Sequence, residues 1–258
     1  MGGLPSRALV GAVLEANLSE KLQQAATALR SGRFVLLYDA DGREEETDLV
    51  IPSGAVTPAH IRTLRTEAGG LICTTIPAEF HLRLGLPYLS DVLHQASAAN
   101  PLLERLATGE VPYEEQGSKP SFGLSINHRK TFTGVTDNDR TLTITRLASL
   151  VGDFGHRSVE WSRNQFAEEF KSPGHVFLLN AHPKLLDGRR GHTELSTGLV
   201  QLAGLPASAT ICEMMNGPSG RALPKADAIK YAAQHDLVFL EGAEVVRAWQ
   251  QRPRARSA

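Results

Sequence analysis

Two kinds of hydrophobic pattern alternate along the chain. Apolar residues at helical spacing in residues 20–31 predict a helix that Asn17 or Ser19 can cap and Gly32 can end. A continuous apolar run from Phe34 to Tyr38 then predicts a buried strand. The same two patterns predict further helices over residues 58–68, 139–151, 193–205, 224–235 and 242–250, and further strands over 49–52, 71–76, 122–127, 175–179, 209–215 and 237–240.

Two segments show neither pattern. Residues 100–120 are polar and contain proline, and we expect a surface insertion or lid there. Residues 152–171 are charged and receive no assignment. Because strands and helices are intermixed and no Pro-, Gly- or Ser-rich linker divides them, we predict an α/β (α+β) fold, a single domain with a mixed β-sheet packed with helices. The predicted domain spans residues 17–252, with a flexible leader at 1–16 and a tail at 253–258.

Composition narrows the class of protein. A chain of 258 residues with 41% hydrophobic content can bury one large core or two modest ones. A net charge of -1 and only 6% aromatic residues argue against nucleic acid and anionic lipid as partners. No apolar run approaches the roughly 20 residues of a membrane span, and the first residues lack a signal-peptide pattern, so we expect a cytoplasmic protein. Cys73 and Cys212 lie in apolar runs and are predicted to be buried, reduced thiols.

The densest chemical signal is an acidic turn at residues 39–48, directly after the first predicted strand. If the segment after Arg43 is extended, Glu44, Glu46 and Asp48 point to the same side. Carboxylates that converge in this way repel one another, and a divalent cation with a preference for hard oxygen ligands, magnesium or manganese, would relieve the repulsion. The alternative is a solvated acidic hairpin that binds nothing. The buried strand predicted directly afterwards favours the first interpretation, because it anchors the carboxylates near the core.

A second candidate site precedes the helix predicted from residue 193. The segment Gly188-Arg189-Arg190-Gly191-His192-Thr193 places arginines and a hydroxyl beside the free amides of a helix start, which is a suitable phosphate site. His192 could also ligate a metal ion. The alternative is that Thr193 merely caps the helix while the arginines are solvated. Glycines on both sides of the arginine pair favour close approach of a ligand.

Three further features allow two interpretations each. His175 begins a predicted strand and is either a structural hydrogen-bonding residue or a catalyst. Glu213 interrupts an apolar run, so it either faces solvent or is a proton-transfer group with a raised pKa. The hydroxyl-rich segment 131–140 could bind a sugar or could be a strand followed by a helix cap.

Taken in order, these segments resemble the 3,4-dihydroxy-2-butanone 4-phosphate synthase family from about residue 19 to about residue 249. The segments that carry the resemblance are Asp41–Asp48, Gly69–Cys73, Asn127–Arg140, Ser172–Val176, Arg190–Glu194 and Thr210–Met215. Each segment alone is weak evidence for the family, but the occurrence of all of them in this order is specific to it. The Asn-His-Arg-Lys-Thr-Phe-Thr-Gly form of the segment at 127–134 is similar to the archaeal, monofunctional branch.

The resemblance implies an enzyme that converts D-ribulose 5-phosphate to formate and L-3,4-dihydroxy-2-butanone 4-phosphate in riboflavin biosynthesis. It implies Mg²⁺ or Mn²⁺ as cofactor and a homodimer with active sites near the subunit interface. It further implies residue roles: Glu44 and His192 as metal ligands; Arg43, Glu44, Glu46, Asp48 and the turn Arg189, Arg190, Gly191, His192 and Thr193 as the substrate site; and His175 and Glu213 as catalytic residues.

One departure from the family pattern falls in the acidic turn. Glu45 stands where the family usually has a small or neutral residue, often Gly or Asn. Two alternative functions remain at this point: a metal-dependent sugar-phosphate isomerase or aldolase, and a catalytically silent binding protein of the same fold.

Overall fold

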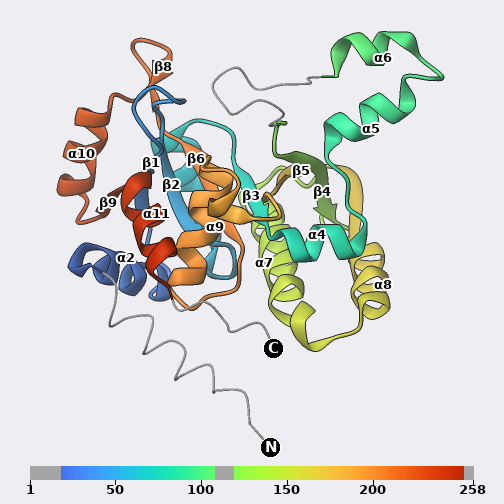
Figure 1. Cartoon of the computed structure of the whole chain (residues 1–258), viewed down its shortest axis with the longest axis horizontal. Helices are drawn as coiled ribbons and strands as arrows, with labels where there is room; N and C mark the ends of the chain where they lie inside the picture. Colours follow the sequence, from blue (N-terminus) through green and yellow to red (C-terminus); the bar gives the residue numbers. More distant parts are fainter. Residues whose placement is uncertain (1–18, 108–118, 253–258) are drawn as a thin grey trace, which may run out of the picture.

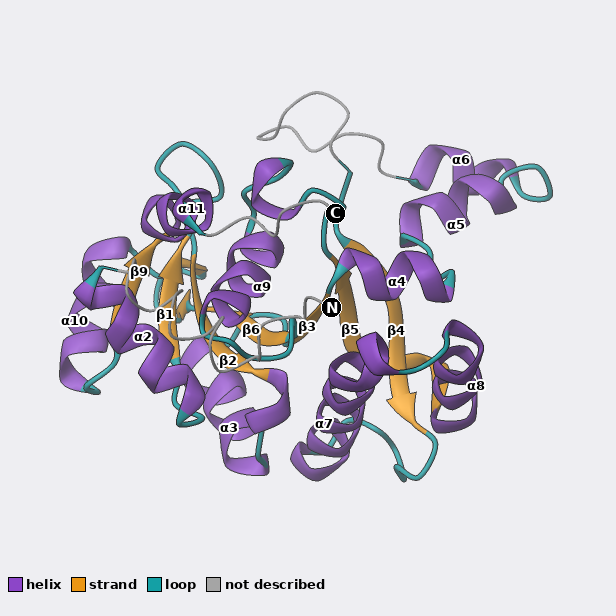
Figure 2. Cartoon of the chain, turned by 60° about the horizontal axis from the view of Figure 1, so that its bottom comes forward, coloured by secondary structure: helices purple, strands orange, loops and turns teal. Residues whose placement is uncertain are grey.

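The computed structural model describes residues 19–107 and 119–252. In these residues a seven-stranded mixed sheet has the order β4-β5-β3-β6-β2-β1-β9 (Figures 1 and 2). The strands of the sheet are β1 Val35–Tyr38, β2 Thr47–Pro52, β3 Cys73–Ile76, β4 Phe122–His128, β5 Phe170–Asn180, β6 Ala209–Glu213 and β9 Val238–Glu241. A short separate hairpin is formed by β7 Met215–Asn216 and β8 Arg221–Ala222.

Helices cover both faces of the sheet. The bounds are α2 Glu20–Arg30, α3 Pro58–Thr63, α4 Ala78–Leu84, α5 Leu89–Ala96, α6 Pro101–Leu106, α7 Asp137–Asp153, α8 Val159–Glu169, α9 His192–Leu202, α10 Lys225–Gln234 and α11 Gly242–Gln251, with a π-helical turn at Leu64–Ala68. The buried residues form two hydrophobic clusters. The helices α2, α9 and α11 contribute to the first, and α3, α7 and α10 contribute to the second. The central strands are therefore buried on both sides.

Successive residues of the central strands point into opposite clusters. Leu37 and Val50 face the cluster beneath α9, whereas Leu36 and Leu49 face the cluster of α7. Since β1 and β2 pair with Leu37 opposite Asp48, Asp48 lies on the α9 face. This alternation directs the acidic residues that follow the first strand toward the start of α9.

The fold prediction is confirmed, and most elements lie where the hydrophobic pattern placed them. Residues 78–84, 89–96 and 101–106 form helices that the pattern did not predict, so the first part of the segment 100–120, expected as a surface insertion or lid, is helical, while residues 108–118 lie outside the described residues. The helices α5 and α6 extend away from the rest of the domain (Figure 1). The unassigned segment 152–171 contains α8, whose only buried residue is Ser162.

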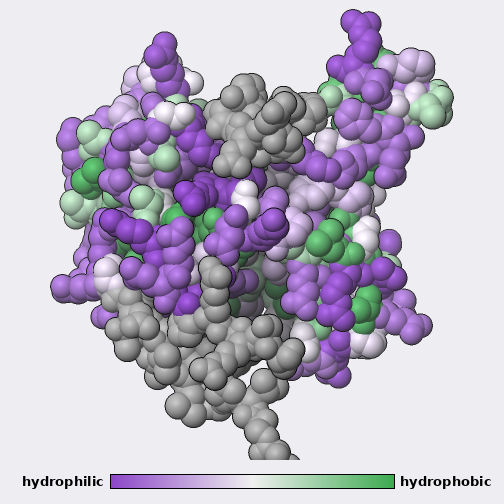
Figure 3. Space-filling model, viewed as in Figure 1, coloured by the Kyte–Doolittle hydropathy of each residue, from purple (hydrophilic) through white to green (hydrophobic). Residues whose placement is uncertain are grey.

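Apolar surface is limited on the face seen in Figure 3, where hydrophilic residues predominate. Within the described ranges, no helix is both long and apolar enough to cross a membrane. Cys73 and Cys212 are buried and free, as predicted. The predicted leader at 1–16 and tail at 253–258 lie outside the described residues.

Candidate active site

Asp39 organises the acidic turn, a role that was not predicted for it from the sequence. Its carboxylate accepts hydrogen bonds from the backbone amides of Glu44 (3.0 Å) and Glu46 (3.1 Å) and from the Arg43 guanidinium (3.0 Å). An aspartate that bonds to nearby backbone amides is typical of a turn, and its position directly after a strand was the signal available in the sequence. The two Asp39 oxygens therefore hold the turn that presents Glu44.

The turn is not the extended segment that the sequence suggested. Glu45 has φ 58°, in the left-handed region, and β2 begins only at Thr47. Glu45 points outward, and its Oε1 accepts a hydrogen bond from the Gly42 amide at 2.8 Å. Glu44, Glu46 and Asp48 still converge, because the backbone reverses at Glu45 before the strand starts.

Asp48 and Glu213 bring the two halves of the site together. They are opposed residues in the antiparallel pair of β2 and β6, so their side chains share the α9 face. Glu213 Oε2 also accepts a hydrogen bond from the Leu71 amide at 2.7 Å. Asp48 is buried, and its Oδ1 has no hydrogen-bond partner among the described residues. A buried carboxylate oxygen without a partner is costly and is the kind of group that a bound cation satisfies.

His192 begins α9 directly above these carboxylates. Its Nδ1 lies 3.0 Å from Glu44 Oε2, and its Nε2 lies 3.2 Å from the Glu46 carbonyl oxygen and 3.7 Å from Asp48 Oδ1. The N-cap of α9 is Gly191 and makes no side-chain cap bond. Thr193 is buried inside the helix, so the capping role considered for it is wrong.

The site disfavours accumulated negative charge. Burial raises the pKa of Asp48, and although the charge of His192 opposes this, Glu213, Glu44 and Glu46 raise it further, to about 8. Burial and then the charges of Glu44 and Glu213 raise the pKa of Glu46. Burial alone would lower the pKa of His192, but Asp48 and the hydrogen bond to Glu44 outweigh it and raise the value to about 9. A positive charge is therefore stabilised between these side chains.

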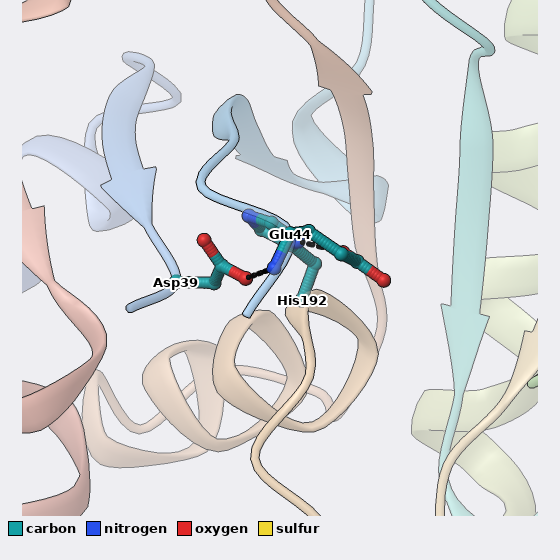
Figure 4. A group of neighbouring side chains, drawn as sticks. All are labelled: Asp39, Glu44 and His192. Atoms are coloured by element: carbon teal, nitrogen blue, oxygen red, sulfur yellow. Dashed lines mark hydrogen bonds and ion pairs between the residues drawn. The ribbon is translucent and has the colours of Figure 1, made fainter. Parts of the chain in front are cut away.

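Asp39, Glu44 and His192 form a group that could hold a metal ion, with one ligand atom from each within 4.8 Å of the others (Figure 4). The Asp39 oxygens accept the hydrogen bonds of the turn, and Glu44 Oε2 lies 2.9 Å from Arg43 Nη1 and 3.0 Å from His192 Nδ1. Hard carboxylate oxygens together with one imidazole suit Mg²⁺ or Mn²⁺. The residues present therefore fit the predicted ion.

Two arginines flank Gly191 at the start of α9. A side chain added at Gly191 would meet Arg189 Nη1 at 2.5 Å and Arg43 Nη2 at 2.6 Å, so only glycine permits both guanidinium groups this position. Arg189 Nη1 also forms a 2.7 Å ion pair with the fully buried Glu194. Arg190 is exposed. The positive groups thus gather beside helix amides, as anion binding requires.

His175 lies apart from the other predicted site residues. It is exposed on β5, two residues before Phe177, which pairs with Cys73 of β3. On the other side of β3, Ile211 of β6 pairs with the same Cys73, and Glu213 lies two residues after Ile211. The two residues thus lie at the same end of the sheet with β3 between them, about 10 Å apart by two strand spacings. Asn127, a residue that the sequence reasoning did not single out, contacts the His175 ring.

Comparison with known proteins decides the family. A profile of 3,4-dihydroxy-2-butanone 4-phosphate synthase matches residues 23–248. An archaeal synthase of that name, from Methanothermobacter thermautotrophicus, is 45% identical over 230 residues, which cover 89% of this chain and 96% of the relative. This chain belongs to the 3,4-dihydroxy-2-butanone 4-phosphate synthase family.

Solved structures of synthases share the fold. The Candida albicans synthase superposes with a TM-score of 0.66 at 25% identity, covering 89% of this chain and 97% of the other. A synthase in complex with two magnesium ions gives a TM-score of 0.62 at 25% identity, covering 86% and 92%. The predicted function is confirmed at the level of the family: the chain is an enzyme of riboflavin biosynthesis that acts on ribulose 5-phosphate.

Proposed function

We propose that this synthase binds its divalent cation, Mg²⁺ or Mn²⁺, through Glu44 and His192. The observation that supports this most strongly is the buried Asp48 Oδ1, which lies 3.7 Å from His192 Nε2 and has no hydrogen-bond partner among the described residues. Burial and the neighbouring carboxylates raise the pKa of Asp48. When bound, the ion supplies an electrophile for the ketone and neighbouring hydroxyl of the sugar. Asp48 and Glu46 face the same space and would receive the sugar hydroxyls.

The phosphate end of the substrate would lie against the start of α9. Arg43 and Arg189 bracket Gly191, and the backbone amides of His192 and Thr193 belong to the first turn, where helix amides lack partners. Arg190 is exposed beside them and would reach the phosphate from solvent. Binding energy at the phosphate orients the reacting carbons, which is how a remote group contributes to turnover.

Proton transfer would fall to His175 and Glu213. The reaction removes a proton beside a ketone, loses water and releases one carbon as formate, so it needs more than one acid or base. Glu213 has one oxygen fixed by the Leu71 amide, whereas the His175 ring lies across β3. The separation of about 10 Å leaves room for the carbon chain of the sugar between the two groups.

The enzyme is proposed to act as a homodimer. Phe132 is 95% exposed and Val135 50% exposed, on the turn that follows β4 beside Asn127. Two apolar side chains exposed on the same turn form a small apolar patch, and exposed apolar patches mark surfaces that partners contact. A second copy of this chain seated on that turn would also cover the exposed His175.

The remaining expectations are the domain limits and the compartment. We propose that the synthase domain occupies residues 17–252, which include the matched region 23–248. We also propose that the enzyme works in the cytoplasm, because both cysteines are free and its sugar-phosphate substrate is a charged metabolite.

The residue roles are tested by His175→Ala and Glu213→Gln. If these residues transfer protons, kcat should fall about a hundredfold or more, while the KM for ribulose 5-phosphate and the melting temperature change little. Near-normal kcat in folded variants would overturn the catalytic assignment without affecting family membership.

The comparison for binding is Arg190→Ala. Its side chain is exposed, so its loss should raise KM and leave the melting temperature unchanged. Arg189 is less suitable, because its removal would also leave the buried Glu194 carboxylate unpaired, a defect of about 3–5 kcal/mol.

A further inference from the structure

His175 is presented by a bulge in the pairing of β4 with β5. Ile126 pairs with Val176, but the next residue, Asn127, pairs with Lys171, so the residues between Lys171 and Val176 have no opposed partner. A bulge of this kind redirects side chains and is frequent beside active sites. Here it leaves the backbone amides of the extra residues without ladder bonds.

Side chains on both β4 and β5 replace the missing ladder bonds. Ser125 Oγ accepts a hydrogen bond from the Gly174 amide at 3.2 Å, and the Ser125 carbonyl accepts one from the Ser172 hydroxyl at 2.8 Å. Asn127 Oδ1 accepts a hydrogen bond from the His175 amide at 2.8 Å. Asn127 is buried, and through this bond it holds the backbone of His175 directly.

The same bond fixes which way the Asn127 amide points. The His175 backbone N–H can only donate, so the atom facing it must be the oxygen, Oδ1. The other end, Nδ2, then lies 3.1 Å from His175 Nδ1 and 3.4 Å from the Thr133 carbonyl. With the amide turned over, Nδ2 and the His175 N–H would face each other as two donors.

The ring nitrogen that faces an amide N–H must accept. Nδ1 of neutral His175 therefore carries no proton, and the proton lies on Nε2, the nitrogen directed away from Asn127. The competing contact from His175 Nδ1 to Asn127 Oδ1 is longer, at 3.4 Å. We infer that Asn127 is a positioning residue that holds neutral His175 in the Nε2–H tautomer, so that His175 offers a proton donor to the substrate.

Gly134 secures this arrangement from the opposite side. A Cβ at Gly134 would meet Asn127 Nδ2 at 2.1 Å, so the amide fits only against a residue with no side chain. The Gly134 amide in turn donates to Asp139 Oδ2 at 2.8 Å, which ties the turn to the start of α7. Asn127 is thus confined between His175 and the turn, and its orientation does not depend on solvent.

The inference rests on the proposed catalytic role of His175, but its first test does not use activity. Protein with ¹⁵N-labelled histidine, with the His175 signals assigned by their loss in His175→Ala, shows by long-range ¹H–¹⁵N spectra which ring nitrogen is protonated. At a pH where the ring is neutral we expect an unprotonated Nδ1 and a protonated Nε2. A protonated Nδ1 in the wild-type protein would overturn the inference, whether or not any variant folds.

The second test is Asn127→Asp, which keeps an acceptor for the His175 amide but replaces the Nδ2 donor by an oxygen. That oxygen accepts from Nδ1–H, so the tautomer should reverse and kcat should fall about tenfold or more with little change in KM. A tautomer that stays unchanged in this variant would overturn the role of Asn127. A reversed tautomer with unchanged kcat would support the tautomer assignment and overturn the catalytic role proposed for His175.

Thr143→Val is the matched control. The fully buried Thr143 Oγ1 accepts a hydrogen bond from the amide of His128, the residue after Asn127 on β4, at 3.0 Å. Its loss removes this bond and the one that Thr143 Oγ1 donates to the Asp139 carbonyl at 2.9 Å, without touching His175. The melting temperature should fall, while the His175 tautomer and the kcat of the folded protein stay at wild-type values. A similar fall in kcat in this control would show that general loosening of β4 explains both variants, against the inference.

Discussion

Asp48 on β2 and Glu213 on β6 are opposed residues of one antiparallel strand pair, and both are carboxylates. Like charges at opposed positions destabilise a sheet, and here Asp48 is also buried. The chain therefore accepts a local cost at the place where His192 and Glu44 approach from α9 and the acidic turn. Such a cost is expected of a site that is completed by a cation.

Replacing Asp48 by Asn should stabilise the metal-free protein. Because the pKa of Asp48 is raised from 3.8 to about 8, the folded state holds a proton that the unfolded state releases between these values. The contribution of Asp48 to the free energy of unfolding therefore falls as the pH rises through this window. Denaturant titrations in EDTA should show an advantage for Asp48→Asn that is larger at pH 8 than at pH 5. A variant less stable than wild type at pH 8 would contradict the account.

The affinity for the cation should increase with pH. Metal binding requires the neutral form of His192, and the raised pKa of about 9 means that a proton must leave first. Below that value the apparent affinity should rise by up to about tenfold per pH unit from this group alone. Calorimetric titration with Mn²⁺ at several pH values measures the slope. His60→Asn, a change outside the site, should keep the slope, and His192→Asn should lose most of the binding. A flat profile in the wild-type protein would remove His192 from the ligand set.

The sequence predicted those parts of the fold whose hydrophobic pattern is set by burial on both sides. The run Phe34–Tyr38 is continuous because β1 lies between two helix layers, and it was identified for that reason. The helix α8 has one buried residue, the polar Ser162, so no apolar period marks it. The predicted start of α9 at Thr193 lies one residue after the observed start at His192. The cap could not be predicted, because Thr193 is a good cap in isolation, whereas Gly191 is required there by the two guanidinium groups.

The candidate site, like the fold, could be predicted from the sequence only in part. Residues whose type is unusual for their surroundings, such as Glu213 in an apolar run, could be selected from the sequence. Asn127 could not, because its function depends on the bulge between β4 and β5, which places His175 beside it across 48 residues of sequence. Pairing between distant strands is tertiary information that local pattern does not contain.

Replacing Glu45 by Asn should stabilise the protein. Glu45 has φ 58°, a conformation that costs most residues about 1–2 kcal/mol and that Asn adopts more readily. Its hydrogen bond to the Gly42 amide is exposed and contributes less than this. Thermal unfolding should show a higher melting temperature for Glu45→Asn with kcat unchanged, because the side chain points out of the site. A lower melting temperature would mean that the bond to Gly42 outweighs the backbone strain.

Changing the exposed Phe132 to Ser should weaken the proposed homodimer. The side chain is 95% exposed in the single chain, so its removal should not affect folding, but it would remove apolar area from an interface formed by this turn. Sedimentation should show dissociation at higher protein concentration than for wild type. Leu82→Ser, at a residue 55% exposed on α4, is the control and should sediment as wild type. A wild-type protein that is a fully active monomer would reject the dimer.

The most direct test of the central claim is formate release from ribulose 5-phosphate by the purified enzyme, with Mg²⁺ and after treatment with EDTA. The account predicts one formate for each sugar consumed in the presence of Mg²⁺, loss of turnover in EDTA, and recovery when Mg²⁺ or Mn²⁺ is returned. Sugar turnover without formate would contradict the assigned reaction. An undiminished rate in the metal-free enzyme would contradict the role given to Glu44 and His192.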